Sequence, residues 1–158
     1  MFNDTPEFGV PYDDDVEGPA LGTVGEKVRA TSVFDGWGYA RLFRNEAGKF
    51  TEVDAYAIPE ALDENFASGF GDLSIHEVAT DPETRLAYSA YYSGGFRVFR
   101  FGDRGLRETG RYIDEGGNNF WGVEQFTSRG ERLVALSDRD YGLYIFKYTG
   151  PGSDNDDD

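Results

Sequence analysis

The stretches Arg85–Phe101 (RLAYSAYYSGGFRVFRF) and Arg132–Tyr148 (RLVALSDRDYGLYIFKY) align without a gap at an offset of 47 residues. Four positions are identical in the two stretches: Arg85/Arg132, Leu86/Leu133, Gly95/Gly142 and Phe99/Phe146. The same register extends upstream to the pairs Glu77/Glu124 and Thr80/Thr127. Self-similarity at a fixed period is typical of folds built from repeated units. The chain is therefore expected to contain at least two copies of one structural unit.

A third copy precedes these two, at an offset of 56 residues. Arg41–Arg44 (RLFR) matches Arg97–Arg100 (RVFR). The spacing of three further positions also recurs, as Phe50/Leu106, Glu52/Glu108 and Tyr56/Tyr112. The longer offset is explained by an insertion within Pro59–Gly71, a connection in which surface insertions are well tolerated.

Each copy is predicted to form short strands separated by turns. In the central copy the strands are expected at about Ser74–Thr80, Leu86–Tyr92, Phe96–Phe101 and Leu106–Ile113. Asp-Pro and Gly-Gly pairs between them are turn chemistry, because Pro presets φ and Gly permits a positive φ. The third strand is apolar on both faces, since Phe96 and Val98 alternate with Phe99 and Phe101. We therefore expect neighbours on both sides of this sheet, with all four side chains buried.

A period of about 40–50 residues with four strands per unit is typical of a β-propeller blade. The outer copies supply three strands each, at about Lys27–Phe34, Tyr39–Arg44 and Phe50–Ile58, and at about Gly122–Thr127, Leu133–Leu136 and Leu143–Tyr148. The expected fold is all-β, a partial propeller of about two and a half to three four-stranded antiparallel blades. A closed propeller has about four to eight blades, so one chain is not expected to close a ring. The first copy also lacks an obvious first strand, unless Pro19–Val24 serves.

Composition excludes several classes of protein. The 158 residues suit a single domain, and the absence of cysteine excludes a disulfide scaffold, a Cys-ligated zinc site and a cysteine nucleophile. The net charge of −15 disfavours a nucleic-acid partner, because the phosphate backbone would be repelled. No apolar run approaches the length of a membrane-spanning helix.

The charge is concentrated at the two ends of the chain. Residues 1–25 carry six acids and no Lys or Arg, and are expected to form an acidic N-terminal segment. Residues 26–150 hold the predicted blades, at about 26–60, 72–114 and 120–149. Residues 151–158 are expected to be a disordered acidic tail.

Four short motifs resemble the repeats of the LVIVD family: Gly95–Phe99 (GFRVF), Gly142–Phe146 (GLYIF), Phe120–Glu124 (FWGVE) and Ser74–Val78 (SIHEV). This family comprises β-propeller proteins of bacteria and archaea, mostly secreted or associated with the cell envelope. The resemblance covers about Glu26–Gly150 and implies the same architecture and location, but no catalytic motif. In length the chain resembles the C-terminal part of a longer propeller. Because two and a half blades leave two open flanks, the expected partners are further copies of the chain, giving a homo-oligomer, or the remaining blades of such a propeller.

His76, the only histidine, is the first candidate for chemistry. Beside Glu77, at the start of the innermost strand of a blade, it would face a central channel. With Asp72 and Glu124 it could ligate a divalent metal. A structural hydrogen bond is the alternative, because the third copy has Val123 at the equivalent place.

The run Asp114–Asn119 (DEGGNN) offers oxygen ligands for calcium or for the hydroxyls of a glycan. The alternative is a loop whose side chains bond to their own backbone. Aromatic residues near turns would suit a protein or glycan partner if exposed, and packing between blades if buried. The resulting candidate ligand-binding set is Trp37, Asn118, Asn119 and Trp121.

No catalytic residue is predicted, because one histidine without a Gly-x-Ser-x-Gly motif gives no support for a hydrolase triad. The favoured function is a non-catalytic extracytoplasmic module that acts in protein or ligand binding, or as an assembly subunit. The alternative is a metal-dependent propeller protein of the lactonase or selenium-binding type, using His76 and the neighbouring acids. The fold by itself does not choose between them.

Overall fold

The computed structural model describes residues 15–17, 27–29, 34, 36–67 and 71–152. Within these residues the chain forms strands and two short 3-10 helices, η3 (Pro59–Leu62) and η4 (Glu64–Phe66), which confirms the all-β prediction. The strands are β1 (Asp15–Glu17), β2 (Lys27–Arg29), β3 (Ala40–Glu46), β4 (Lys49–Tyr56), β5 (Glu77–Asp81), β6 (Leu86–Ala90), β7 (Phe96–Gly102), β8 (Gly105–Tyr112), β9 (Phe120–Ser128), β10 (Glu131–Asp138) and β11 (Gly142–Phe146). Among the described residues, no helix is long and apolar enough to cross a membrane.

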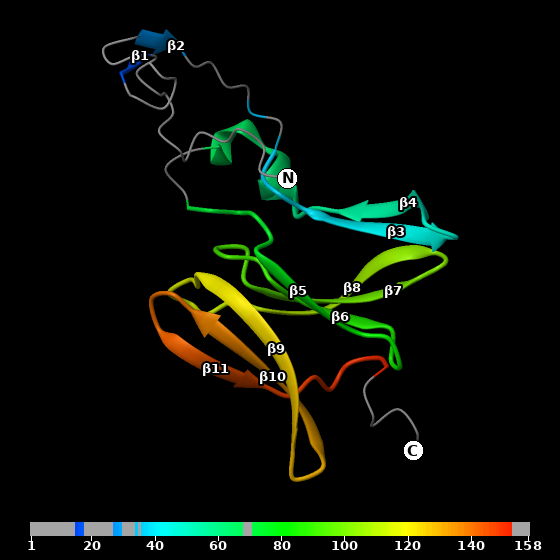
Figure 1. Ribbon diagram of the computed structural model, residues 1–158. Coiled ribbons are helices and arrows are strands. Elements are labelled where there is room, and N and C mark those ends of the chain that lie inside the picture. Colours follow the sequence, from blue (N-terminus) through cyan, green and yellow to red (C-terminus); the bar gives the residue numbers. More distant parts are fainter. Residues whose placement is uncertain (1–14, 18–26, 30–33, 35, 68–70, 153–158) are drawn as a thin grey trace.

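The three repeat copies form three antiparallel sheets that lie one over another (Figure 1). Sheet 1 is the β3–β4 hairpin, sheet 2 has the order β5-β6-β7-β8, and sheet 3 has the order β9-β10-β11. The four strands expected from the central copy are thereby confirmed as one sheet. Equivalent strands of neighbouring sheets lie side by side, since β4 contacts β8 and β5 contacts β9.

The first copy differs from the prediction. Of the strand expected over Lys27–Phe34, residues 27–29 form β2, which pairs with β1 instead of extending sheet 1, and residues 30–33 lie outside the described residues. The segment after it is held by other partners: the Trp37 amide donates to the Ala61 carbonyl, and the Ile75 amide donates to the Gly38 carbonyl. The described part of sheet 1 has two strands. The strand considered at Pro19–Val24 lies outside the described residues.

Sheets 1 and 2 share an irregularity at the same repeat position. The β3–β4 register shifts between Leu42 and Phe43, and the β7–β8 register shifts between Val98 and Phe99. Each pair of positions is separated by the 56-residue offset read from the sequence. A β-bulge re-aims the side chains of a strand, so a bulge at equivalent positions indicates the same local geometry in both sheets. The backbone pairing of sheets 1 and 2 therefore repeats at the same offset of 56 residues as the sequence.

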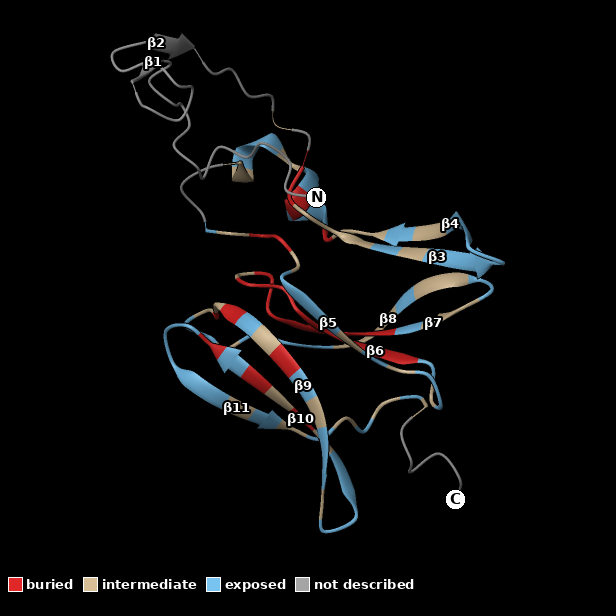
Figure 2. Cartoon of the chain, viewed as in Figure 1, coloured by how far each residue is buried: buried red, intermediate tan, exposed pale blue. Residues whose placement is uncertain are grey.

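Sheet 2 is covered on both sides. Because residues paired across an antiparallel ladder share a face, its side chains divide into two sets. Face A, turned toward sheet 3, carries Leu86, Tyr88, Ala90, Phe96 and Val98. Face B, turned toward sheet 1, carries Ala87, Ser89, Arg97 and Phe99. Figure 2 shows the buried residues concentrated in the middle of the stack.

Of the four β7 side chains expected to be buried, three are confirmed: Phe96, Val98 and Phe99 are each no more than 4% exposed. Phe101 is only partly buried, so the prediction is wrong for this residue. It lies beyond the last residue pair between β6 and β7 and borders a surface hollow lined in part by Leu42 and Val53. Sheet 1 therefore covers β7 only in part at the end that carries Phe101.

One aromatic contact between neighbouring sheets occurs twice. Tyr56 of sheet 1 lies against Phe99 of sheet 2, with ring centroids 4.6 Å apart and an interplanar angle of 58°. Tyr112 of sheet 2 lies against Phe146 of sheet 3, at 4.8 Å and again 58°. The two tyrosines are equivalent at the offset of 56 and the two phenylalanines at 47. Sheet 1 therefore packs on sheet 2 as sheet 2 packs on sheet 3.

Replacing Phe99 by Ala should lower the free energy of unfolding by about 3–5 kcal/mol, because a fully buried ring is lost and a cavity remains between sheets 1 and 2. Denaturant unfolding followed by circular dichroism measures this loss. Tyr141→Ala is the matched control, since that ring is 61% exposed and its removal should change stability by no more than about 0.5 kcal/mol. Equal losses for the two variants would contradict the assigned packing.

Candidate functional site

The candidate site is an aromatic cluster at one end of the stack, where β5 and β9 begin. The His76 ring lies 5.3 Å from the ring of Tyr92 and 4.9 Å from that of Trp121, measured between centroids. Tyr92 is buried, whereas His76 is exposed and Trp121 is 50% exposed. The cluster therefore exposes the Trp121 indole and the His76 imidazole to solvent, and the buried phenol of Tyr92 packs against the imidazole.

Backbone bonds between sheets 2 and 3 hold the cluster in place. The Tyr92 amide donates to the Phe120 carbonyl, and the Phe120 amide donates back to the Tyr92 carbonyl. On the other side, the His76 amide donates to the Ala90 carbonyl at the end of β6. Tyr92 has a φ of 40°, a strained conformation for a residue with a Cβ, and the reciprocal bonds to Phe120 stabilise it. The start of β9, with Trp121, is thereby fixed beside His76.

Charged and polar groups surround the cluster. Burial raises the pKa of the Tyr92 hydroxyl, and the charge of Asp72 raises it further. The charge of Arg139 and a hydrogen bond with the Trp121 side chain act in the opposite direction. The Arg139 amide donates to the carbonyl of Asn119, so the β10–β11 turn lies beside the loop that leads into β9 and Trp121. Tyr92 stays protonated at neutral pH, so its hydroxyl serves as a hydrogen-bonding group.

The structure does not gather the four residues predicted as metal ligands at one point: two of the carboxylates accept bonds from backbone amides, and the third lies on another face. The Glu77 carboxylate accepts a hydrogen bond from the Val123 amide at 2.8 Å, joining β5 to β9. The Asp72 carboxylate accepts from the Ser74 amide at 2.7 Å. Glu124 is paired with Ala135 and shares with it the face of sheet 3 turned away from Glu77. Within the part of the chain that the structure describes, no group of three or more His, Asp or Glu side chains is arranged to hold a metal.

Asn118 and Asn119 belong to a second, buried network. The Asn118 side chain donates to Asp114 and Asp138 and accepts from the Asp114 amide at 2.7 Å. The Asn119 amide donates to the Asp138 carboxylate at 2.9 Å, and that carboxylate also accepts from the amides of Asp140 and Tyr141. The loop thus bonds to itself and to the β10–β11 turn, in agreement with the structural alternative considered for it.

Asp114 extends this network to two tyrosines. The hydroxyls of Tyr112 and Tyr144 donate to its carboxylate, and these two bonds are the main reason that its pKa lies below the ordinary value. The same bond to Asp114 raises the pKa of Tyr144 to about 12. The Asp114 carboxylate therefore ties the loop between sheets 2 and 3 to strands of both.

Trp37 lies away from this surface. It is 1% exposed, and its indole nitrogen donates to the Phe66 carbonyl at 3.0 Å. It forms a second core with Ile58, Ala61, Leu73 and Tyr91. Of the four residues predicted to bind a ligand, Trp121 is the one that presents an open aromatic face, with Asn119 adjoining it.

One polar group was not predicted from the sequence. Arg97, only 7% exposed, makes an ion pair with Glu108 at 3.2 Å, and Tyr56 of sheet 1 donates its hydroxyl to the same carboxylate. This bond and burial both raise the pKa of Tyr56, burial having the larger effect. The signal was present in the repeat, because Arg41 and Glu52 of the first copy match Arg97 and Glu108.

Comparison of the chain with models of protein families, with curated proteins and with solved structures finds no match. The site is therefore interpreted from its own geometry.

Asp138→Asn should lower the free energy of unfolding by about 1–3 kcal/mol at pH 7, because the amide nitrogen cannot accept the bonds made to the carboxylate. Burial by itself would raise the pKa of Asp138, but its hydrogen bonds outweigh burial and the pKa is lowered. The carboxylate therefore stabilises the fold above the unfolded-state pKa of about 3.9, and this contribution is lost as the pH falls through the folded-state value.

Thermal or denaturant unfolding from pH 7 down to about pH 2 measures the effect. The difference between Asp138→Asn and the original chain should shrink as the pH falls below about 4. Asp103→Asn is the control, since the Asp103 side chain is 87% exposed and its pair with Arg44 lies at the surface. A pH-independent difference for Asp138→Asn would contradict the role assigned to this carboxylate.

Proposed function

We propose that this chain is a non-catalytic binding module built from propeller-type blades, with the His76–Tyr92–Trp121 cluster as its recognition surface. The propeller-type arrangement is supported by the repeated Tyr–Phe contact between sheets and by the pairing of equivalent strands in the stack. The resemblance to LVIVD repeats supports the same arrangement and a place outside the cell or at its envelope.

The observation that carries the proposal is the position of Trp121. Its ring is half exposed and rests on His76, while the other tryptophan, Trp37, is buried in a core. An exposed indole gains free energy by packing its face against another apolar surface. A rigid aromatic platform at the end of stacked sheets is suited to recognition.

The ligand class that this surface fits best is a glycan. The apolar face of a sugar ring stacks on an aromatic ring, and its hydroxyls require hydrogen-bonding groups at the rim of the platform. The charges of Asp72 and Arg139 both act on Tyr92, so a carboxylate and a guanidinium lie near the cluster. The carboxylates of Asp72 and Glu77 are held by backbone amides, which favours positioning over proton transfer.

Tryptophan fluorescence tests this proposal, because the two tryptophans differ sharply in exposure. Titration with soluble oligosaccharides of glucose, galactose and N-acetylglucosamine should protect the exposed tryptophan from acrylamide quenching for at least one sugar. Trp121→Ala should weaken binding of that sugar, measured by calorimetry, by at least about tenfold, or 1.4 kcal/mol. Leu62→Ala is the control, since Leu62 is 57% exposed and lies on η3, away from the cluster.

If no oligosaccharide changes the quenching of Trp121, the cluster is not a glycan site. Binding that survives Trp121→Ala unchanged would likewise contradict the proposal.

A further inference from the structure

The outer face of sheet 3 repeats the buried face of sheet 2. At the offset of 47, the face A residues Leu86, Tyr88, Phe96 and Val98 correspond to Leu133, Ala135, Leu143 and Ile145. Ladder pairs place these four residues on one side of sheet 3, together with Phe126. The other side of the sheet packs on sheet 2 through Val134, Leu136 and Phe146.

This repeated face is uncovered. Leu143 is 70% exposed, Ile145 49% and Phe126 37%, whereas Phe96 and Val98 at the equivalent places in sheet 2 are nearly inaccessible. β11 is correspondingly exposed along most of its length in Figure 2. The face also carries Glu124 and Ser137, and its apolar side chains surround them. An exposed apolar cluster on an open sheet is a site of association. We call it the exposed A face, defined by Phe126, Leu133, Ala135, Leu143 and Ile145.

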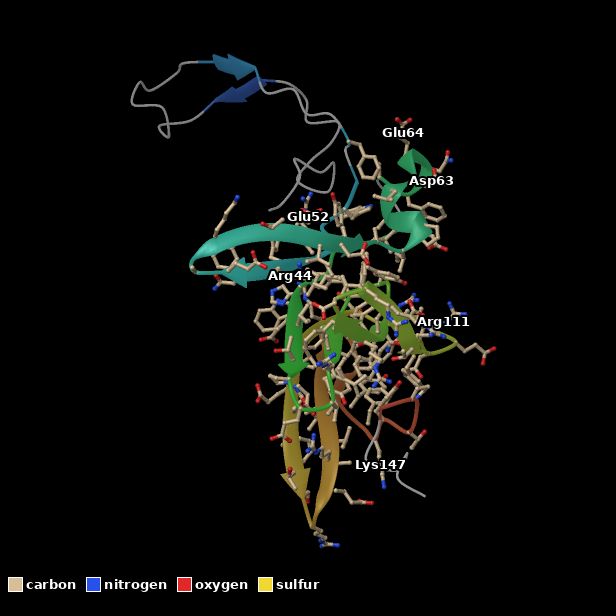
Figure 3. The ribbon with its side chains drawn as sticks, turned by 90° about the vertical axis from the view of Figure 1, so that its right-hand side faces the viewer. Arg44, Glu52, Asp63, Glu64, Arg111 and Lys147 are labelled. Carbon is tan, nitrogen blue, oxygen red and sulfur yellow. The ribbon has the colours of Figure 1, made fainter. Side chains whose placement is uncertain are left out.

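The opposite end of the stack carries the complementary half. At the offset of 56, the face B residues Arg97, Phe99 and Glu108 of sheet 2 correspond to Arg41, Phe43 and Glu52. Arg41 and Glu52 make the same ion pair, at 2.8 Å, as Arg97 and Glu108. Figure 3 shows Glu52 on the side of the β3–β4 hairpin turned away from sheet 2, opposite Arg44.

This second face is also uncovered. The side chains of Arg41 and Glu52 are 49% and 41% exposed, while that of Arg97 is 8% exposed. Phe43 is 46% exposed and Phe50, on the same side of the hairpin, 66%. We call it the exposed B face, defined by Arg41, Phe43, Phe50 and Glu52. In the described residues, face A of sheet 2 packs on the side of sheet 3 that is equivalent to face B, and face B of sheet 2 packs on the side of sheet 1 opposite the exposed B face. Both contacts between neighbouring sheets therefore join an A face to a B face.

We propose that the exposed A face of one chain packs against the exposed B face of a second copy, head to tail, and that two copies close a ring of six sheets. The A-to-B contact is the one already made twice inside the chain, so the new interface continues an existing one. The three sheets that the repeat copies form in the described residues are too few for a ring. Two copies of the chain supply six such sheets, and three copies would supply nine. Closed propellers have about four to eight blades, which selects two copies. The inference rests on the propeller-type stacking proposed above but not on glycan binding.

A head-to-tail interface differs from a face shared symmetrically by two chains. In a head-to-tail contact the two partners use different surfaces, and closure depends on the rotation between them. Damage to either face should therefore prevent assembly. In an A-to-A contact, by contrast, damage to the B face would have no effect.

Light scattering coupled to size exclusion tests the proposal on the full 158-residue chain. The expected mass is about 35 kDa, twice the 17.6 kDa of one chain. Leu143→Glu on the A face and Phe50→Glu on the B face should each reduce the mass to that of one chain. Val78→Glu is the matched control: Val78 lies on β5 of sheet 2, is 42% exposed, and belongs to neither the exposed A face nor the exposed B face. This variant should keep the mass of two chains.

Mixing the two monomeric variants distinguishes the head-to-tail arrangement. Leu143→Glu retains an intact B face and Phe50→Glu an intact A face, so the mixture should recover a species of two chains through one intact interface. Circular dichroism establishes that each variant is folded, and Leu143→Ser replaces Leu143→Glu if the charge prevents folding.

A monomeric original chain would overturn the proposal and favour cover by further blades of a longer protein. Assembly that survives Phe50→Glu but not Leu143→Glu would indicate an A-to-A contact and overturn the head-to-tail arrangement. A continuous series of larger species would overturn closure at two copies. None of these outcomes depends on sugar binding, so the two proposals fail separately.

Discussion

The structure depends on packing between the faces of neighbouring sheets, concentrated in the Tyr–Phe contact that each sheet makes with the next. A single short antiparallel sheet buries too little apolar surface to be stable in water, and a two-stranded hairpin such as sheet 1 buries less still. The stack solves this by covering both faces of sheet 2. Its third strand, β7, is consequently apolar on both sides instead of alternating.

The same packing explains why a largely buried ion pair occurs between sheets 1 and 2. Arg97 and Glu108 are covered by sheet 1, and the Tyr56 hydroxyl completes the bonding of Glu108 while its ring packs on Phe99. Such a pair is costly to bury unless its remaining bonds are satisfied, and here one tyrosine supplies both the apolar cover and a hydrogen bond. Arg41 and Glu52 have the same residue types and the same pairing, but remain at the surface because none of the described sheets covers them. Position in the stack, not residue type, decides which pair is buried.

The function proposed for the chain also follows from stacking. Reciprocal bonds between Tyr92 and Phe120 join sheet 2 to sheet 3 at the end where their first strands begin. They fix the backbone next to Trp121, whose ring lies against His76 at the surface. The interior contacts are thus repeated and structural, whereas the ends of the sheets differ from copy to copy. Variation there costs little stability, since loop and end residues are not part of the repeated interface.

Much of the fold could be predicted from the repeat. The offsets of 47 and 56 located the four strands of sheet 2, the strands of sheet 3 and the β3–β4 hairpin, because side-chain alternation and turn residues are local signals. Burial of Phe96, Val98 and Phe99 followed from the absence of a polar face. Which segments would pair at the start of the first copy could not be predicted, since Trp37 and Gly38 bond to residues more than 20 positions away. The sequence by itself determined the repeated unit and its apolar faces. Only the tertiary structure decided which copies of those faces are buried and which side chains meet at Trp121, because both depend on contacts between distant parts of the chain.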